Sequence, residues 1–224
     1  MAARAHAPAQ LEAVERVSSE IEPATAIAKL ARLRTEAEET ARLANLLGRS
    51  LYTAIILPVL GALTIGLAEG MSLSSQLVWG GFVALGAVAM LRSYAHTISE
   101  PFERPALKSF AKDLSAILLY NGFAWGAGAF LALPTATGMA AAILFAIVPA
   151  AAVALLLRER EAVFLFLAPV ATLASFASVL RPFADGALDA ALILVACAVV
   201  AGLTLLIDRR ATGDFVRPAM LPLT

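Results

Sequence analysis

Few side chains in this chain of 224 residues could carry out acid–base, nucleophilic or metal chemistry. There are two histidines, His6 and His96, and one cysteine, Cys197. His6 lies in a polar N-terminal stretch, and His96 follows an apolar stretch, beside Tyr94. Metal or haem binding usually needs two or more ligands facing one centre, and the apolar stretches offer His96 no second ligand. We therefore expect no metal and no other cofactor, and we interpret His96 as an isolated residue at the membrane interface.

The motifs of common catalytic sites are missing as well. The sequence contains no GxxxxGK[ST], no HExxH and no GxSxG with triad partners. Three carboxylates, Glu69, Asp189 and Asp208, lie only at the ends of apolar stretches, where they are typical of solvated helix ends rather than of an ion pathway. The formal net charge is zero, so no overall field attracts nucleic acid. We expect a protein with no enzymatic activity and no nucleic-acid partner.

One set of polar and helix-breaking residues lies inside the apolar stretches: Pro58, Asn121, Pro149 and Pro169. Each is the eighth or ninth residue of its stretch from the same side of the membrane. This spacing predicts a common depth, roughly 12 Å from the boundary at a rise of 1.5 Å per residue. We call these four residues the mid-membrane layer. Each proline frees the carbonyl four residues earlier, and the Asn121 amide is a donor at that level.

Two interpretations of the mid-membrane layer are open. In the first, the prolines are kinks that shape the bundle, and Asn121 bonds across helices to the freed carbonyls. In the second, the layer is a hinge at which the shape of the bundle can switch.

Six apolar stretches must position these residues, and they cover 51–68, 72–91, 114–133, 138–157, 162–180 and 190–207. Each is long enough for a helix that crosses the ~30 Å hydrocarbon core of a bilayer. Of all residues 60% are hydrophobic and 15% charged, and this charged share is below the usual quarter. The sequence predicts an all-α integral membrane protein. It would have a cytoplasmic helical segment (1–50), a six-transmembrane-helix bundle (51–207) and a short cytoplasmic tail (208–224).

The distribution of positive charge predicts the orientation of these helices. Sixteen of the seventeen Lys and Arg residues fall in the N-terminal segment, the second and fourth loops and the tail. Only Arg181 falls on the other side. Because cytoplasmic loops carry the excess of Lys and Arg, both termini are expected in the cytoplasm. The chain is rich in Arg and Ala and lacks a secretory signal, which favours the inner membrane of a bacterium.

The N-terminal segment contains a candidate coiled coil. Pro23 is expected to separate two helices in it. In the second helix, small or apolar residues recur in alternating steps of four and three: Ala26, Leu30, Leu33, Ala37, Thr40, Ala44 and Leu47. This heptad seam favours a homodimer through a short coiled coil. A helix that lies on the membrane surface or on its own bundle is the alternative.

The loop after the second stretch is basic and amphipathic. Arg104, Lys108 and Lys112 recur every four residues on one helical face, and apolar residues from Leu107 to Leu114 recur on another. This pattern favours a short interfacial helix whose cations contact anionic lipid headgroups or a protein partner. Ordinary positive-inside topology is the alternative.

The third stretch adds a small-residue motif and a resemblance. Gly122 and Gly126 form a GxxxG motif, which permits close helix packing within the bundle or between copies. Residues 120–134 read YNGFAWGAGAFLALP and follow the basic loop. This arrangement resembles the six-span transmembrane sensor regions that form the N-terminal membrane modules of bacterial histidine kinases and diguanylate cyclases. The fourth and fifth stretches, with Pro149 and Pro169, are similar in layout, and the likeness covers about residues 45–207.

The resemblance implies a sensory module, but no kinase or cyclase residues can be carried over. Only residues 208–224 follow the last stretch, too few for such a domain. We expect either a part of a longer sensor or a protein that works through a partner. The leading hypothesis is a non-enzymatic sensory or regulatory module of the bacterial inner membrane. An accessory structural subunit of a larger membrane complex is the alternative, and a small transporter or channel is the second alternative.

Overall fold

A computed structural model shows that the chain is helical over nearly all the residues it describes. It describes the backbone of residues 7–67, 71–101, 103–132, 143–180 and 186–214, with side chains over 25–67, 71–101, 103–131, 145–180 and 186–207. Within these ranges there is no strand, which confirms the all-α prediction there. The contacts divide the chain into two units, Met1–Leu43 and Ala44–Thr224, and each is described by itself.

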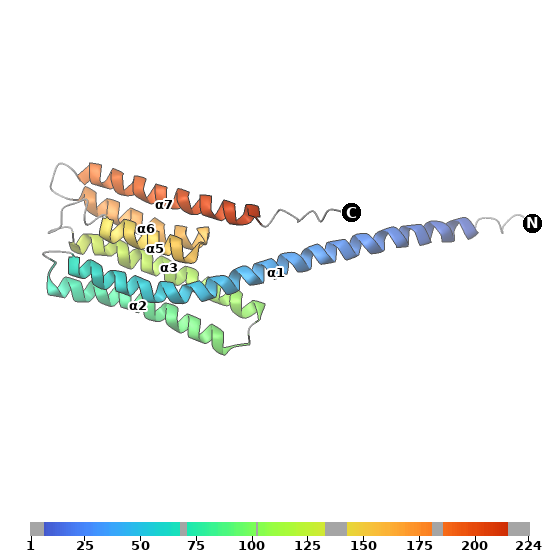
Figure 1. Cartoon of the computed structure of the whole chain (residues 1–224), viewed down its shortest axis with the longest axis horizontal. Helices are drawn as coiled ribbons and strands as arrows, with labels where there is room; N and C mark the ends of the chain where they lie inside the picture. Colours follow the sequence, from blue (N-terminus) through green and yellow to red (C-terminus); the bar gives the residue numbers. More distant parts are fainter. Residues whose placement is uncertain (1–6, 68–70, 102, 133–142, 181–185, 215–224) are drawn as a thin grey trace, which may run out of the picture. The chain divides into compact units, whose positions relative to one another are not determined.

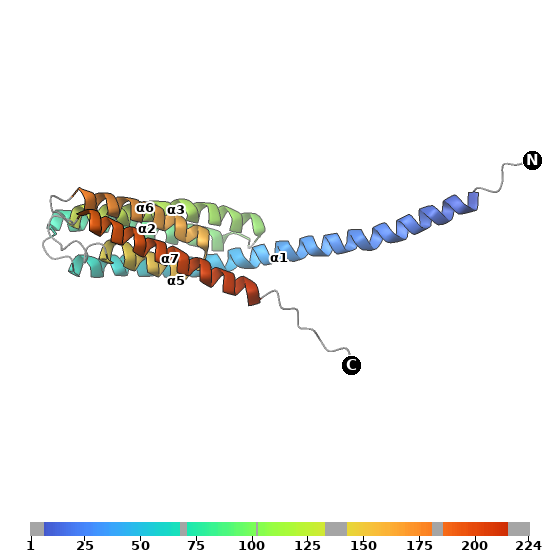
Figure 2. The same cartoon turned by 90° about the horizontal axis from the view of Figure 1, so that it is seen from above.

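The second unit is a helical bundle. The helical elements of the chain are α1 (Ala7–Leu67), α2 (Leu73–Ser99), α3 (Arg104–Ala132), the π-helix η1 (Ile143–Ile147), α5 (Val148–Leu157), α6 (Arg160–Val179) and α7 (Gly186–Asp214). Helices α2 to α7 run side by side with the last part of α1 (Figures 1 and 2). Helix α3 packs against α2 and α6, and α6 packs against α5 and α7. The two most contacted helices, α3 and α6, thus form the centre of the bundle.

Five helices are long and apolar enough to cross a membrane: Thr25–Leu67, Leu73–Ser99, Arg104–Leu131, Arg160–Val179 and Gly186–Ile207. The fourth expected span, 138–157, corresponds to a shorter apolar helix, Phe145–Leu157. Residues 138–142 of that span lie outside the described residues. These lengths are compatible with a multi-pass membrane protein, and the count of six spans stays a prediction.

The π-helix before α5 has a cause in the sequence. Pro149 is the second residue of α5, and a proline cannot donate a hydrogen bond to the carbonyl four residues earlier, here that of Phe145. Its ring also crowds that carbonyl. The wider turn of a π-helix moves this carbonyl away from the proline ring. The π-helix here is one short turn, which is the form in which π-helices usually occur. The irregularity expected of a proline at this position is therefore a local widening of the helix.

Pro23 does not separate two helices, so that prediction was wrong. Helix α1 runs from Ala7 to Leu67 through both Pro23 and Pro58. A proline inside a helix removes one hydrogen bond and adds a clash, at a cost of about 3 kcal/mol. The neighbours of Pro23 are mostly Ala and Glu, which are strong helix formers, and they maintain the helix on both sides of it.

The basic loop forms the first turns of the helix that continues into the third apolar stretch, and its contact with headgroups or a partner stays a prediction. Helix α3 begins at Arg104 and continues to Ala132. The side chains of Leu107, Phe110 and Leu114 are at most 1% exposed, so this apolar face packs against protein. Their i, i+3, i+7 spacing is equally suited to a lipid interface and to a bundle core, so the pattern alone could not assign this apolar face to the core.

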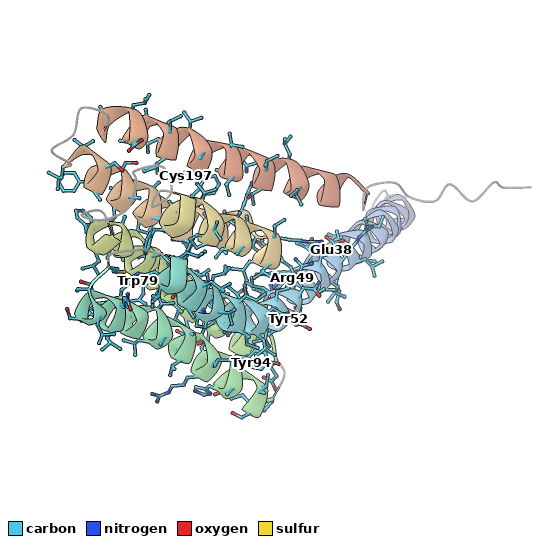
Figure 3. All side chains as sticks on the ribbon, turned by 60° about the vertical axis from the view of Figure 1, so that its left-hand side comes forward. Glu38, Arg49, Tyr52, Trp79, Tyr94 and Cys197 are labelled. Atoms are coloured by element: carbon cyan, nitrogen blue, oxygen red, sulfur yellow. The ribbon has the colours of Figure 1, made fainter. Side chains whose placement is uncertain are left out.

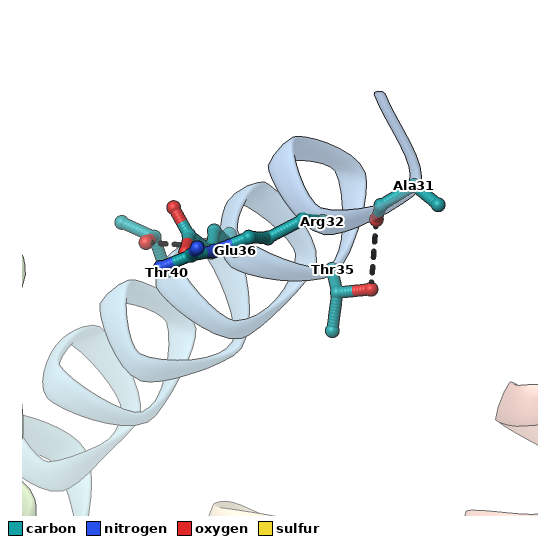
Figure 4. A network of polar contacts seen from close by, with 5 residues as sticks. All are labelled: Ala31, Arg32, Thr35, Glu36 and Thr40. Atoms are coloured by element: carbon teal, nitrogen blue, oxygen red, sulfur yellow. Dashed lines mark hydrogen bonds and ion pairs between the residues drawn. The ribbon is translucent and has the colours of Figure 1, made fainter. Parts of the chain in front are cut away.

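The N-terminal unit is stabilised by interactions within its own helix. Arg32 pairs with Glu36 at 3.0 Å, and Arg34 pairs with Glu38 at 2.9 Å. The hydroxyl of Thr35 donates to the Ala31 carbonyl (Figure 4). Ion pairs four residues apart add about 0.2–0.5 kcal/mol each to an isolated helix. The two local ion pairs therefore favour the helical state of this segment.

The heptad seam is only partly available for a coiled coil. Leu30 and Leu33 are 65% and 52% exposed. Leu47, the last residue of the seam, is 4% exposed and belongs to the bundle unit. The seam that a second copy could contact thus ends before Leu47.

Candidate functional site

The α2–α3 contact is built around Asn121. This side chain is 1% exposed, and its Nδ2 donates to the Ile117 carbonyl of its own helix at 3.0 Å. That bond turns Oδ1 toward Gly86 of α2, and a Cβ atom on Gly86 would collide with it. The missing side chain of Gly86 therefore makes room for the Asn121 amide. The Cα–H of Gly86 points at Oδ1, a contact of the weak kind that recurs between close helices.

The α3–α6 contact uses the two glycines of the GxxxG motif. A Cβ on Gly122 would collide with the Phe166 carbonyl and the ring of Pro169. A Cβ on Gly126 would lie 2.8 Å from Cβ of Leu173 and 3.0 Å from the Pro169 carbonyl. In membranes, close van der Waals contact at small residues is a main source of helix association. The GxxxG motif of this chain thus serves packing within the bundle, and its partner is the kinked region of α6.

An aromatic cluster lies one to two turns along α3 from Asn121. The ring of Trp79 meets those of Trp125 and Phe145 edge-on, with centroids 5.1 and 4.9 Å apart. The indole Nε1 of Trp79 donates to the Ala124 carbonyl at 2.9 Å. A Cβ on Gly128 would collide with both Trp79 and Phe145. The absence of a side chain at Gly128 lets the Trp79 indole reach an α3 carbonyl, and all three rings are fully buried (Trp79 is labelled in Figure 3).

Helix α1 joins this region at Gly61, three residues after Pro58. A Cβ on Gly61 would lie 3.2 Å from Val83 of α2 and 4.0 Å from Cζ2 of Trp125. Pro58 itself is half-buried, and the carbonyl that it frees belongs to Ala54, which is 2% exposed.

The structure brings some of the mid-membrane layer together. Asn121 and Gly122 are adjacent on α3, and Pro169 packs on Gly122. Pro58 lies one turn before the α1 residue that faces Trp125. Pro149 is buried, and the ring one turn before it, Phe145, belongs to the aromatic cluster. The hydrogen bond that Asn121 donates goes to Ile117, not to a carbonyl freed by a proline, so the expected cross-helix bond is not the one observed.

Arg49 links α1 to the turn between α5 and α6. Its guanidinium Nη1 donates to the Leu157 carbonyl at 3.2 Å (Arg49 is labelled in Figure 3). Leu157 ends α5, and Arg158 follows with φ 53°, the left-handed conformation in which a helix commonly stops. A cation at a helix C-terminus interacts favourably with the unpaired carbonyls there. Arg49 therefore binds this turn as well as carrying positive charge.

The predicted basic and titratable residues lie at the surface. Lys108 and Lys112 are exposed, and Arg104 is half-buried at the start of α3. His96 Nδ1 lies 3.5 Å from a Glu100 oxygen, and both side chains are exposed. Among the described residues, no three His, Cys, Asp or Glu side chains gather where they could hold a metal ion.

Sequence reasoning missed three of these contacts: the Gly86–Asn121 pair, the bond from Trp79 to Ala124, and the bond from Arg49 to Leu157. Gly86 and Trp79 were visible as a small residue and an aromatic residue in an apolar stretch. Nothing in the sequence indicates which residue of α3 each would face.

Together, these features define an all-helical, apolar bundle whose central helix is packed through glycines around one buried amide. The comparisons with known proteins found no matching family, no matching curated protein and no matching solved structure.

Proposed function

We propose that this chain is a non-enzymatic sensory or regulatory module of the bacterial inner membrane that acts through a protein partner. The observation that carries the proposal is the extent of α1. This one helix includes the exposed Leu30 and Leu33 of the N-terminal segment and also Gly61, which contacts α2 and α3. A change of packing in the bundle would act on the same helix that a partner can contact.

The contacts around Asn121 support a switchable bundle. Helices α2, α3 and α6 approach one another through glycine contacts at which even one methyl group collides. Close-packed interfaces of this kind tend to have discrete arrangements rather than continuous ones. The stimulus would be the state of the membrane, a lipid or a small apolar ligand that favours one arrangement.

The proposed orientation places both termini in the cytoplasm, and it can be tested directly. Reporter fusions after Glu69, Ala136 and Gly186 should all report the periplasm. A cytoplasmic signal from any of the three fusions would contradict the six-span topology.

The partner is tested with the full chain in its own membranes. Crosslinking followed by mass spectrometry identifies the proteins bound to the wild type, to Pro169→Ala and to Thr172→Ala. Pro169 packs on Gly122, whereas Thr172 is an exposed residue of the same helix that bonds only to its own helix at Ala168. We expect Pro169→Ala to change the amount of bound partner while the melting temperature stays near that of Thr172→Ala. Equal partner binding by all three proteins would contradict the sensory proposal.

A homodimer through the N-terminal helix is part of this proposal. A cysteine at Leu33 should crosslink between copies in membranes, and a cysteine at Thr35, on the outer side of the predicted seam, should not. The native Cys197 does not interfere, because it is 3% exposed. Crosslinking of equal efficiency at both positions would contradict a specific seam.

The second candidate, an accessory structural subunit, has its own support. At Gly66, Gly81 and Gly202 an added Cβ would have no described atom within 4 Å, which is expected of outer faces of the bundle. Small residues on outer faces would allow the helix of another subunit to approach closely. Purification of a stoichiometric membrane complex that Gly81→Leu or Gly202→Leu disrupts would favour this candidate over the sensory module.

A further inference from the structure

Two buried polar atoms in the middle of α3 have no hydrogen-bond partner among the described protein groups: Oδ1 of Asn121 and Nε1 of Trp125. The two residues are 1% and 0% exposed. One atom is an acceptor and the other a donor. Buried polar atoms are nearly always paired, because leaving them unpaired forfeits the hydrogen bonds that water would provide. This pair of complementary atoms therefore points to a ligand that can both donate and accept.

The two atoms face the same part of the bundle. Asn121 and Trp125 are four residues apart, which places them on one face of α3. Long side chains in a helix lean toward its N-terminus, so the Trp125 ring leans toward the level of Asn121. The Cζ2 atom of Trp125 is two bonds from Nε1. It lies 4.0 Å from the position that a Cβ added to Gly61 would occupy. The edge of the ring that carries the donor thus faces α1.

Helix α1 adds a further acceptor near this level. Pro58 has no N–H, so the Ala54 carbonyl lacks its ordinary donor in the helix. Ala54 is 2% exposed, and Pro58 lies one turn before Gly61. Such a freed carbonyl inside a membrane helix is usually paired with a neighbouring group or an ordered water.

We propose that one water molecule binds between α1, α2 and α3 at this point. It accepts a hydrogen bond from Nε1 of Trp125 and donates one to Oδ1 of Asn121. Its second hydrogen is donated to the Ala54 carbonyl. Buried waters typically make about three hydrogen bonds to otherwise unpaired groups, which is the number available here. The helices approach closely at Gly61 and Gly86, which favours the smallest ligand that can both donate and accept.

The two tryptophans of the chain allow a direct test, because among the described residues only Trp125 has no protein partner for its indole N–H. The Trp79 indole N–H is bonded to the Ala124 carbonyl and serves as the internal control. The full chain is labelled with ¹⁵N-tryptophan in detergent, and cross-relaxation between water and each indole N–H is measured by NMR. We expect a water cross-peak at Trp125 and none at Trp79. The Asn121→Leu variant should lose the Trp125 cross-peak.

A cross-peak between water and the Trp125 N–H could also arise indirectly, through a nearby hydroxyl whose proton exchanges with water. The hydroxyl of Tyr120, which donates to the Phe82 carbonyl, exchanges its proton with water and lies next to Asn121 in the chain. The Tyr120→Phe variant should therefore keep the Trp125 cross-peak. Its loss in Tyr120→Phe, or its absence from the wild type, would overturn the proposal. The wild-type measurement alone is decisive if Asn121→Leu does not fold.

Discussion

Helices α3 and α7 have the same length, 29 residues, but they differ in how much of their surface is buried in the bundle. Of the five candidate spans, α7 is the most hydrophobic and α3 the least. Yet 50% of the residues in the most apolar part of α3 are buried in the bundle. In the most apolar part of α7 only 28% of the residues are buried. In a soluble protein the most hydrophobic helix would be the most buried one. For α3 and α7 the order is reversed.

The reversal follows from the solvent. Lipid chains are as apolar as leucine, so burying a leucine against another helix gains little. A helix is retained in the centre by what lipid cannot offer, which is close backbone contact and hydrogen-bond partners. Helix α3 has Gly122, Gly126 and Asn121 for this purpose, whereas Leu194, Val195 and Leu203 of α7 are more than half exposed. Between α3 and α7, small and polar residues rather than hydrophobicity therefore distinguish the central helix from the exposed one.

The largest effect should come from filling a central glycine. Gly122→Leu places a side chain against the Phe166 carbonyl and Pro169, whereas a Cβ on Gly202 of α7 has no described atom within 4 Å. Overpacking usually costs 1–3 kcal/mol, and because backbone resists here we expect about 3 kcal/mol or more. Gly202→Leu should be nearly neutral. Thermal unfolding in mild detergent, followed by size-exclusion chromatography, compares the two variants, and equal melting temperatures would refute the contrast between α3 and α7.

A smaller loss is expected at the α2 side of the same interface. Gly86→Ala collides with the Asn121 amide, whereas Gly81→Ala faces open space on the same helix. We expect a loss of about 1–3 kcal/mol for the first and little change for the second. Because the clash is with one side chain, the double variant Gly86→Ala/Asn121→Ala should recover part of the loss. Failure of this rescue in the same melting assay would mean that α2 and α3 do not meet at these two residues.

The sequence allowed the helical class, the apolar helices and the importance of Gly122 and Gly126 to be predicted, because length, charge and small-residue spacing act locally along the chain. The sequence could not indicate which residues of neighbouring helices these residues would contact. Gly86 was one of several glycines in its stretch, and its contact with Asn121 depends on how two helices are rotated about their axes. The face from Leu107 to Leu114 shows the same limit: its spacing fits a lipid interface as well as a core, and only packing decides between them.

The smallest effect should come from Asn121 itself. The bond from its Nδ2 to Ile117 is made within one helix, and polar contacts in membranes average only about 0.6 kcal/mol. We therefore expect Asn121→Leu to lower the free energy of unfolding by about 0.5–1 kcal/mol, at the low end of the contributions of such polar groups. Thr204→Val on α7 is the matched control, since Thr204 is also buried and donates to its own helix at Val200. Melting temperatures of the two variants should differ by no more than a few degrees.

The sign of the Asn121→Leu effect separates the two interpretations of the mid-membrane layer. A buried amide whose oxygen has no partner among the described protein groups contributes little to stability on its own. If Asn121→Leu raises the melting temperature while Thr204→Val leaves it unchanged, the bundle would be more stable without the amide. An asparagine at this position would then be explained by switching or partner binding, as the hinge interpretation requires. A clear loss of several kcal/mol would instead make Asn121 a packing group and favour the accessory subunit over the sensory module.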